Sequence, residues 1–315
     1  KNMLINGDMR VSQRNGTSAS TVSASAGAYT LDRWLLYTGS GNYSVQQVSE
    51  STLPDGFAYA CKITVSSVGS TSSASNVAFI EQKIEGYNIN SLNWGGGNAS
   101  TPATCTLSFW VKSSVTGTYS VHFGNDSDRF YVSTYTISSA NTWEKKSITV
   151  TGPTDGTWNY TNGRGLEIAF PFVAGSNNTT STLNSWITTE DYMSTSSVQW
   201  GTNAGATFYL TGCQFEISSI ATPFEHENYT ESLARCQRYY YKLGSTNGSA
   251  WTKFGGGMIR TTGDAVALIQ NPVEMRAVPS IGTTGTASDY GLFHANTTTA
   301  SSAVPVLDPQ STQKM

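Results

Sequence analysis

The chain has 315 residues, a formal net charge of −3 and only 12% charged residues. This sparse, balanced charge provides no basic surface for nucleic acid, and no stretch reaches the roughly 18 consecutive apolar residues of a membrane-spanning helix. Because 38% of the residues are hydrophobic and 11% are aromatic, the chain is too apolar for a disordered protein. Its richness in Ser, Thr, Asn and Gly argues against a helical bundle and predicts a β protein with a polar surface.

Apolar and polar residues alternate along much of the chain between residues 31 and 217, which is the pattern of half-buried β-strands. In residues 104–112, for example, Leu107 and Phe109 face one way while Ser108 and Trp110 face the other. Strands joined by Gly/Ser/Asn-rich loops indicate an antiparallel sandwich or barrel rather than alternating βα units. The expected strands are residues 31–38, 43–50, 57–65, 77–84, 104–112, 118–123, 130–137, 142–150, 165–172 and 207–217.

One segment after residue 223 has helical spacing. Asn228 can cap its first turn, and Glu231 lies at the capping-box position. Apolar residues then recur at the spacing of one helix face, which we interpret as a docking stripe. They are Tyr229, Leu233, Cys236 and Tyr240. Further strands are expected at 258–261, 265–269 and 304–307. We therefore expect a β-sandwich domain over residues 1–227, and a connector helix with a small β region over residues 228–315.

The cysteines give no sign of a disulfide framework or a metal site. No two are close in sequence and no C-x-x-C occurs, while three lie in expected strands, so all four are predicted to be buried, reduced thiols. The three histidines likewise lack zinc-binding spacing. No cofactor is predicted, because no phosphate-binding or nucleophile motif occurs. The four cysteines are Cys61, Cys105, Cys213 and Cys236, and the three histidines are His122, His226 and His294.

Three carboxylate pairs are candidates for chemistry: Asp126 with Asp128, Glu190 with Asp191, and Glu225 with Glu227. The first pair is expected in a hairpin turn, because it lacks the Gly and the distal Glu of a calcium loop. The second pair could hydrogen-bond a sugar, but sequence neighbours do not by themselves supply the two opposed carboxylates of a glycosidase. The third pair is expected to anchor the helix. No catalytic residue is predicted.

Aromatic residues in or beside the Asn/Thr/Gly-rich loops are candidates for sugar binding. Flat rings stack on the C–H faces of sugars, while neighbouring polar groups bind the hydroxyls. The alternative, left open by the sequence, is that these rings cover sheet edges or form subunit contacts. The candidate glycan-binding residues are Trp94, Trp158, Tyr160, Trp186, Glu190, Asp191, Tyr192 and Trp200.

Two stretches carry a resemblance to a known group of proteins. NMLINGDMRVSQR (2–14) and TLDRWLLY (30–37) resemble the opening of bacteriophage tail-fibre and related virion proteins with a jelly-roll, carbohydrate-binding-module-like domain. Residues 206–243, with ATPFEH and CQRYY, are similar to the end of that domain. QKIEGYNI, TLSFWVKSS, ANTWEKKSITVTG and GRGLEIAF match in order between them. The resemblance covers most of residues 1–243, whereas only NPVEMRAVPSI (271–281) matches beyond.

The resemblance implies a jelly-roll fold and a non-catalytic virion protein that is assembled in the host cytoplasm. It also implies a homotrimer that contacts other virion proteins and binds a host cell-surface polysaccharide. The alternative is a purely structural capsid decoration, head fibre or tail connector, and a depolymerase is the weakest hypothesis because no paired carboxylates stand out. The residues expected at the trimer interface are Tyr239, Tyr241, Phe254, Met258, Ile259 and Met275.

The sequence departs from jelly-roll sugar modules at one point. Such modules often open with N-G-D-F-E and carry an Asp in the closing strand, and these two acids help to bind a structural calcium. Here Arg10 replaces the Glu, and Thr211 or Gly212 replaces the Asp. Because a guanidinium would repel a cation, no metal is expected at this place.

Overall fold

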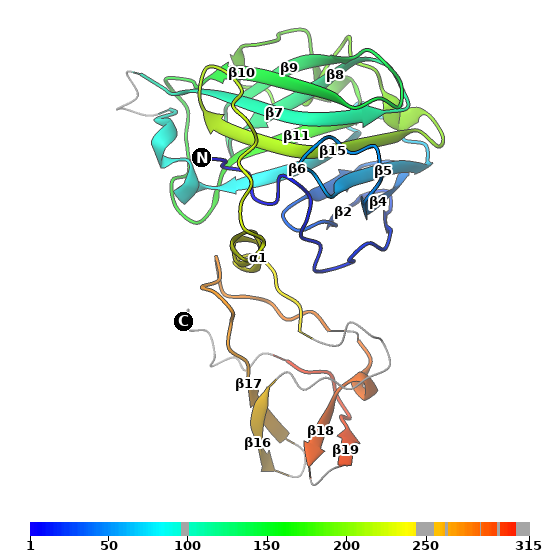
Figure 1. Ribbon diagram of the computed structural model, residues 1–315, viewed down its shortest axis with the longest axis vertical. Helices are drawn as coiled ribbons and strands as arrows, with labels where there is room; N and C mark the ends of the chain where they lie inside the picture. Colours follow the sequence, from blue (N-terminus) through cyan, green and yellow to red (C-terminus); the bar gives the residue numbers. More distant parts are fainter. Residues whose placement is uncertain (96–100, 244–254, 262–263, 284, 295–296, 307–315) are drawn as a thin grey trace. The chain divides into compact units, whose positions relative to one another are not determined.

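The computed structural model describes all residues except 96–100, 244–254, 262–263, 284, 295–296 and 307–315 (Figure 1). Contacts divide the chain into two compact units. Unit 1 comprises residues 1–236 and 240–243, and unit 2 comprises residues 237–239 and 244–315. Most of the helix that follows the sandwich therefore groups with unit 1, whereas the sequence analysis placed it with the C-terminal region.

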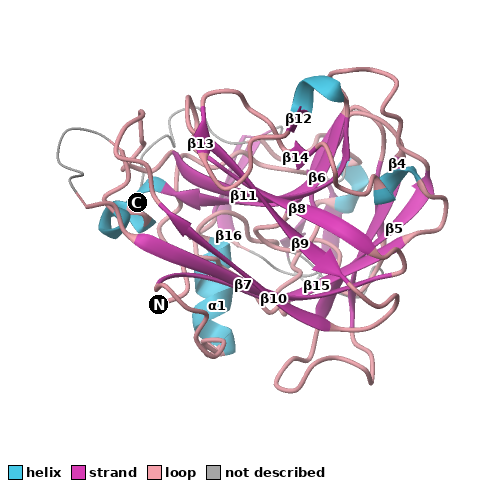
Figure 2. Ribbon diagram, turned by 90° about the horizontal axis from the view of Figure 1, so that it is seen from above, coloured by secondary structure: helices cyan, strands magenta, loops and turns pink. Residues whose placement is uncertain are grey.

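Unit 1 contains two large antiparallel sheets that lie face to face (Figures 1 and 2). Sheet A has six strands, in the spatial order β1 (Ser20–Val22), β4 (Asn42–Val48), β5 (Ala60–Ser67), β15 (Thr207–Ile217), β7 (Thr104–Ser113) and β10 (Glu144–Thr151). Sheet B has seven strands, in the order β13 (Trp186–Ile187), β9 (Phe130–Ile137), β8 (Gly117–Gly124), β11 (Arg164–Ala174), β6 (Val77–Glu85), β3 (Leu35–Thr38) and β2 (Ala26–Tyr29).

The chain crosses repeatedly between the two sheets. β5 is in sheet A, β6 in sheet B and β7 again in sheet A, and the same alternation recurs from β9 through β10 and β11 to β15. Such crossings between two antiparallel sheets define a jelly-roll β-sandwich, as the sequence analysis predicted. Short 3-10 turns and one small parallel pair, β12 (Thr179–Thr180) with β14 (Met193–Ser194), lie in the connections. The turns are Gly86–Asn88, Asn90–Leu92, Ser176–Asn178 and Trp200–Thr202.

The ten strands predicted between residues 31 and 217 are all present. β9 and β15 have the predicted bounds, whereas β3 begins only at Leu35 because the preceding residues form a turn in which the Trp34 amide donates to the Leu31 carbonyl at 3.0 Å. The alternation is clearest in β4, whose odd-numbered residues, such as Tyr43 and Val45, are buried. The short strands β1, β2, β12, β13 and β14 were not predicted, because two to four residues carry too little periodicity.

The sandwich core is rich in aromatic residues. Phe109 makes edge-on contacts with Tyr135 and Phe170, with ring centroids 5.0 Å apart in each case. The four cysteines are free and buried, as predicted. Burial raises the pKa of both the Cys61 and the Cys105 thiols to about 12, so these two residues are neutral, apolar packing groups at physiological pH.

The N-terminal segment pairs with the closing strand β15. The Met3 amide donates to the Phe215 carbonyl, and the Cys213 amide donates to the Gly7 carbonyl, each at 2.9 Å. A Cβ on Gly7 would lie 2.1 Å from the Cys213 carbonyl oxygen, so only glycine fits at this approach. Gln13 Nε2 continues the connection by donating to the Tyr240 carbonyl at 2.8 Å. The opening and closing segments of unit 1 therefore form one structure.

Helix α1 (Tyr229–Gln237) begins where the sequence predicted. The Asn228 side-chain oxygen accepts a hydrogen bond from the Thr230 amide at 3.0 Å, which is the capping contact of an N-terminal Asn. Cys236 is buried on the inner side of the helix, whereas Tyr229 is 52% exposed, so the expected apolar stripe docks through Cys236 and not through Tyr229.

Unit 2 contains two hairpins in its described residues: β16 (Gly256–Thr261) with β17 (Asp264–Leu268), and β18 (Gly291–His294) with β19 (Thr297–Ala300). A 3-10 turn, Ala287–Asp289, precedes the second hairpin. Strands β16 and β17 were predicted, although their pairing was not, and β18 and β19 were not predicted. Residues 304–306 form no strand, so the expected strand at 304–307 is wrong for these three residues, and residue 307 lies outside the described chain.

Candidate functional site

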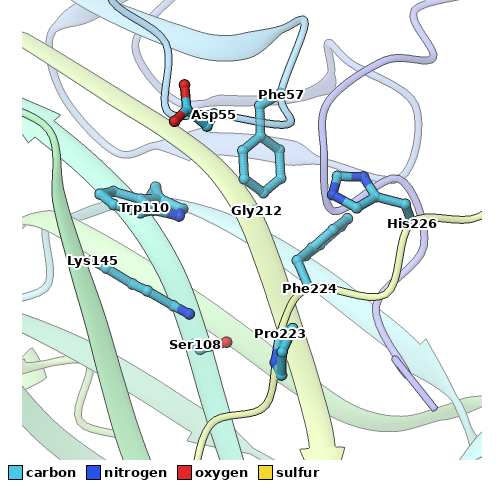
Figure 3. A pocket seen from close by; sticks show the side chains of 9 residues that line it. All are labelled: Asp55, Phe57, Ser108, Trp110, Lys145, Gly212, Pro223, Phe224 and His226. Carbon is cyan, nitrogen blue, oxygen red and sulfur yellow. The ribbon is translucent and has the colours of Figure 1, made fainter.

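A pocket of about 310 Å³ opens on the outer face of sheet A, the face turned away from the core (Figure 3). β7 supplies Ser108 and Trp110, and β10 supplies Lys145, whose Cα pairs with that of Trp110. The remaining walls come from the loop before β5 and from the segment that leads to α1. Asp55, Phe57, Ser108, Trp110, Lys145, Gly212, Pro223, Phe224 and His226 line the pocket.

A bulge in β15 shapes the floor. The pairing of β15 with β7 shifts between Thr211 and Gln214, and Gly212 there has a φ of +61°, a conformation that favours glycine. A Cβ on Gly212 would lie 2.7 Å from Phe57 Cζ and 3.1 Å from Trp110 Cδ1. The missing side chain therefore lets both rings rest on the strand backbone.

Three aromatic rings form one wall. Phe57 meets Phe224 with centroids 5.1 Å apart and His226 at 5.4 Å, and the last two rings lie 4.9 Å from each other. Figure 3 shows this group facing the Trp110 indole across Gly212. The Trp110 indole is half-buried on the solvent side of the sheet. An exposed flat ring beside a pocket of mixed polarity suits a ligand with both C–H faces and hydroxyls.

The polar groups of the pocket lie on two sides of the indole. In Figure 3 the Lys145 ammonium and the Ser108 hydroxyl lie on one side of Trp110, and the Asp55 carboxylate lies on the other side. Asp55 is the single carboxylate among the lining residues, so the pocket does not present the two opposed acids of glycoside hydrolysis.

A second aromatic pair on the same face, Trp143 edge-on to Tyr209, is covered by a lysine. The Lys112 ammonium lies 4.1 Å from the centroid of Tyr209 and 5.2 Å from that of Trp143, and it forms an ion pair with Glu50. Because this cation covers both rings, they offer a ligand less open surface than Trp110 does.

The aromatic residues selected from the sequence do not line this pocket, and the structure divides them among three places. Trp94, Trp158 and Trp186 form an edge-on cluster with centroids 5.4 to 5.9 Å apart. Trp94 is fully buried, and its Nε1 donates to the Ala103 carbonyl at 2.8 Å. Tyr160 is attached to this cluster through a hydrogen bond from its hydroxyl to the Trp94 carbonyl.

Trp200 lies in a second place, inside the sandwich. It stacks on Phe208 with centroids 5.2 Å apart and is 1% exposed. Trp94 and Trp200, both expected from the sequence to contact a glycan, are therefore buried in this structure, and neither indole presents an open face. Both indoles belong to the hydrophobic core of unit 1.

The third place is the outer face of sheet B. Tyr192 stacks on Phe79 at 4.8 Å and on His122 at 4.4 Å, and its hydroxyl donates to Glu190 at 2.8 Å. Tyr192 and Asp191 are both buried as a cover over the sheet, whereas Glu190 is exposed. Burial of the Tyr192 ring on both sides leaves it without an open face for a sugar.

Beneath this cover lies a buried charged cluster. Glu167 accepts from His122 Nε2 at 3.2 Å and from Arg164. Burial alone would raise the pKa of Glu167, but the His122 hydrogen bond and the Arg164 charge lower it. Glu81, with Lys83 Nζ at 3.1 Å, shows the opposite shift, because burial and the Glu167 charge raise its pKa to about 7.

The other two carboxylate pairs have the predicted structural roles. Asp126 and Asp128 lie in the β8–β9 turn, where the Asn125 side-chain oxygen accepts from the amides of residues 127, 128 and 129. Glu227 accepts from Ser232 at 3.1 Å and from Arg235, and Glu225 accepts from the Asn2 amide at 2.6 Å. These contacts fix the start of α1 and the N-terminus.

The residues near the expected calcium position do not fit a cation. Arg10 pairs with Asp8 and donates to the Glu227 carbonyl at 3.0 Å. A guanidinium therefore stands where the calcium-binding modules carry a Glu. The Thr211 hydroxyl is buried and donates to the Tyr59 carbonyl at 2.8 Å. Within the described ranges, no cluster of three or more His, Cys, Asp or Glu side chains could hold a metal ion.

Removal of divalent cations is accordingly expected to leave the melting temperature of unit 1 unchanged. Arg10 already neutralises Asp8, so a chelator has no ligand set to empty. Differential scanning fluorimetry with and without EDTA measures this. A decrease of several degrees that calcium reverses would contradict the expectation.

The residues expected at a subunit interface lie in or near unit 2. Met258 is 71% exposed on β16, Met275 is half-buried, and Tyr239 and Tyr241 are half-buried. Ile259 belongs to β16, and Phe254 lies outside the described residues. In the part of the chain that the structure describes, no helix has both the length and the apolar character needed to span a membrane.

No protein-family model and no curated protein matches the sequence. Among solved structures, the enzymatically active domain of bacteriophage CBA120 tailspike protein 4 is 16% identical with a TM-score of 0.37, over 69% of this chain and 21% of that chain. TmCBM61 in complex with β-1,4-galactotriose is 10% identical with a TM-score of 0.34, over 69% of this chain and 99% of that chain.

The N-terminal cellulose-binding domain of Cellulomonas fimi β-1,4-glucanase C is 12% identical with a TM-score of 0.31, over 64% of this chain and 100% of that chain. At such TM-scores, the description of the fold depends on the strand order and register of the chain itself. By that order, unit 1 is a jelly-roll β-sandwich with an aromatic pocket on one open sheet face.

Proposed function

We propose that this chain is a non-catalytic virion protein of the bacteriophage tail-fibre type that binds a host cell-surface glycan through the pocket around Trp110. The single observation that carries the glycan part is the half-buried indole on the outer face of sheet A, beside a 310 Å³ pocket. A sugar ring would stack on this indole, and Ser108 and Lys145 would bind its polar groups.

The virion part is supported by the resemblance of residues 2–14, 30–37 and 206–243 to the phage group. In the structure these stretches contact one another: Asn6 Nδ2 donates to the Asp32 carbonyl at 2.9 Å, and Trp34 Nε1 donates to the Asn6 carbonyl at 3.0 Å. Asn2 Nδ2 donates to the Cys213 carbonyl at 3.0 Å. The resemblance thus follows a connected structural element and not scattered positions.

Glycan-array binding by the purified chain, followed by titration calorimetry, tests the proposal. Trp110→Ala should weaken binding to the best glycan at least about tenfold, because truncation of a central aromatic anchor commonly costs more than 1 kcal/mol. Trp143→Ala is the matched control: its indole lies on the same face but is covered by Lys112, so affinity should be kept.

Two outcomes would contradict the glycan proposal. Absence of binding to host-derived polysaccharides and to the array would favour the alternative, a purely structural capsid decoration, head fibre or tail connector. Equal losses in Trp110→Ala and Trp143→Ala would show that the pocket is not the site. Immunogold labelling of purified particles tests the virion assignment separately.

We further propose that the chain forms a homotrimer through unit 2, as the sequence resemblance implies. The β16–β17 hairpin supports self-association, because Met258 and Val266 pair on one face, next to the 75% exposed Leu268. A two-stranded hairpin with an open apolar face is only marginally stable alone.

Light scattering should give a molar mass of three times 33.7 kDa for the intact chain. Met258→Ser with Leu268→Ser should lower this mass, and a monomer mass for the intact chain would contradict the proposal.

A further inference from the structure

We infer that the pocket selects a glycan that carries a carboxylate, such as one containing uronic acid, and that Lys145 is the residue that determines this preference. The inference rests on the proposed function and specifies its ligand class. Two observations carry it: the position of the Lys145 ammonium and the pairing of the nearby lysines.

Most nearby lysines are already neutralised. Lys112 pairs with Glu50, and Lys146 pairs with Glu144 at 2.6 Å. Among the described residues, none of the ion pairs includes Lys145, although its side chain lines the pocket. An ammonium without a carboxylate partner, held beside aromatic walls, is the group most able to gain an ion pair from a ligand.

The position of Lys145 in the sheet determines which part of a bound sugar its ammonium would contact. Lys145 stands opposite Trp110 in the β10–β7 ladder, so its side chain rises on the same face as the indole. Figure 3 shows the ammonium on the same side of the indole as the Ser108 hydroxyl, with the Asp55 carboxylate on the other side. A sugar ring stacked on Trp110 would therefore direct a C6 carboxylate to Lys145 and Ser108, away from the repulsion of Asp55.

Neutral hydroxymethyl groups would gain less at this position. A carboxylate accepts charge-assisted hydrogen bonds from both the ammonium and the hydroxyl, whereas a hydroxymethyl group leaves the ammonium without a counter-charge. Because the pocket is open to solvent, the preference should be moderate and should weaken as salt screens the charge.

The test uses the full chain and a panel of glucuronate-, galacturonate- and mannuronate-containing oligosaccharides, each paired with its carboxyl-reduced, neutral counterpart. Affinities are measured by calorimetry at low and high NaCl. The wild-type chain should bind the acidic member of its best pair roughly five- to tenfold more tightly than the reduced member. Lys145→Gln should remove this difference and its salt dependence, because the amide keeps a hydrogen-bond donor at this position but carries no charge.

Lys146→Gln is the matched control, because it makes the same change in net charge one residue away at an ammonium already paired with Glu144. It should keep the preference for the acidic member. Equal or tighter binding of the neutral member, or an unchanged preference in Lys145→Gln, would overturn the inference while the proposed function stands. If no panel or array member binds, or if Trp110→Ala binds like the wild type, the proposed function itself fails.

Discussion

Trp94→Ala is expected to lower the free energy of unfolding of unit 1 by about 3–5 kcal/mol, the range for removing a fully buried aromatic side chain. The indole has no exposed surface, and it contacts Trp158, Trp186 and Phe215. Its removal would leave a cavity among three rings and would remove one of the two hydrogen bonds that the Ala103 carbonyl accepts. Urea denaturation, followed by circular dichroism and tryptophan fluorescence, measures the change.

Trp110→Ala is the matched comparison, because its half-buried indole should cost less than about 1.5 kcal/mol. The pair of variants therefore separates two roles of tryptophan: Trp94 should affect stability, and Trp110 should affect glycan binding. If Trp94→Ala kept its stability but lost glycan binding, the indole would act as a ligand contact and the description of the Trp94–Trp158–Trp186 cluster as core would be wrong.

Glu81→Gln is expected to stabilise the protein relative to the wild type at pH 8 but not at pH 5. Burial and the Glu167 charge raise the pKa of Glu81 to about 7, above the ordinary value of 4.5. Between pH 4.5 and about pH 7, the folded state holds a proton on Glu81 that the unfolded state has released. The free energy of unfolding of the wild type therefore decreases as the pH rises through this range. Glutamine resembles the protonated carboxyl and does not titrate.

The difference in unfolding free energy between Glu81→Gln and the wild type should therefore grow by on the order of 2 kcal/mol from pH 5 to pH 8. Thermal melts across this range provide the measurement. Glu231→Gln, at an exposed position of α1, should run parallel to the wild type. Parallel curves for Glu81→Gln as well would mean that Lys83 keeps the Glu81 carboxylate ionised when folded.

Much of the fold could be predicted because its strands obey a two-residue period. β9 and β15 were predicted with their observed bounds, since alternation is read directly from the residues. The starts of β3 and β5 were placed too early, because apolar residues such as Trp34 and Tyr59 precede these strands in phase with them but lie outside them. Pairing between distant strands, such as β15 with β5, depends on long-range contacts that the period does not encode.

The candidate site could not be assembled from the sequence. One signal was present: in TLSFWVK, Trp110 alternates out of phase with Leu107 and Phe109, which indicates a tryptophan on the solvent face of a strand. The walls, however, come from residues far along the chain, such as Phe57 and Phe224, and they meet only through strand pairing and the bulge at Gly212. The apparent signal, tryptophan in polar loops, instead identified core residues such as Trp94 and Trp200.

The connection between the first and last segments of unit 1 has a mechanical consequence. Tension applied along the chain beyond α1 would reach the Gln13–Tyr240 hydrogen bond and the Arg14 guanidinium, 3.5 Å from the Tyr240 ring centroid, before it reached either sheet. The Arg10 contact with the Glu227 carbonyl would bear the load next. These contacts of the N-terminal segment would therefore resist a force applied from the C-terminal side before the force could deform the sheet face that holds the pocket.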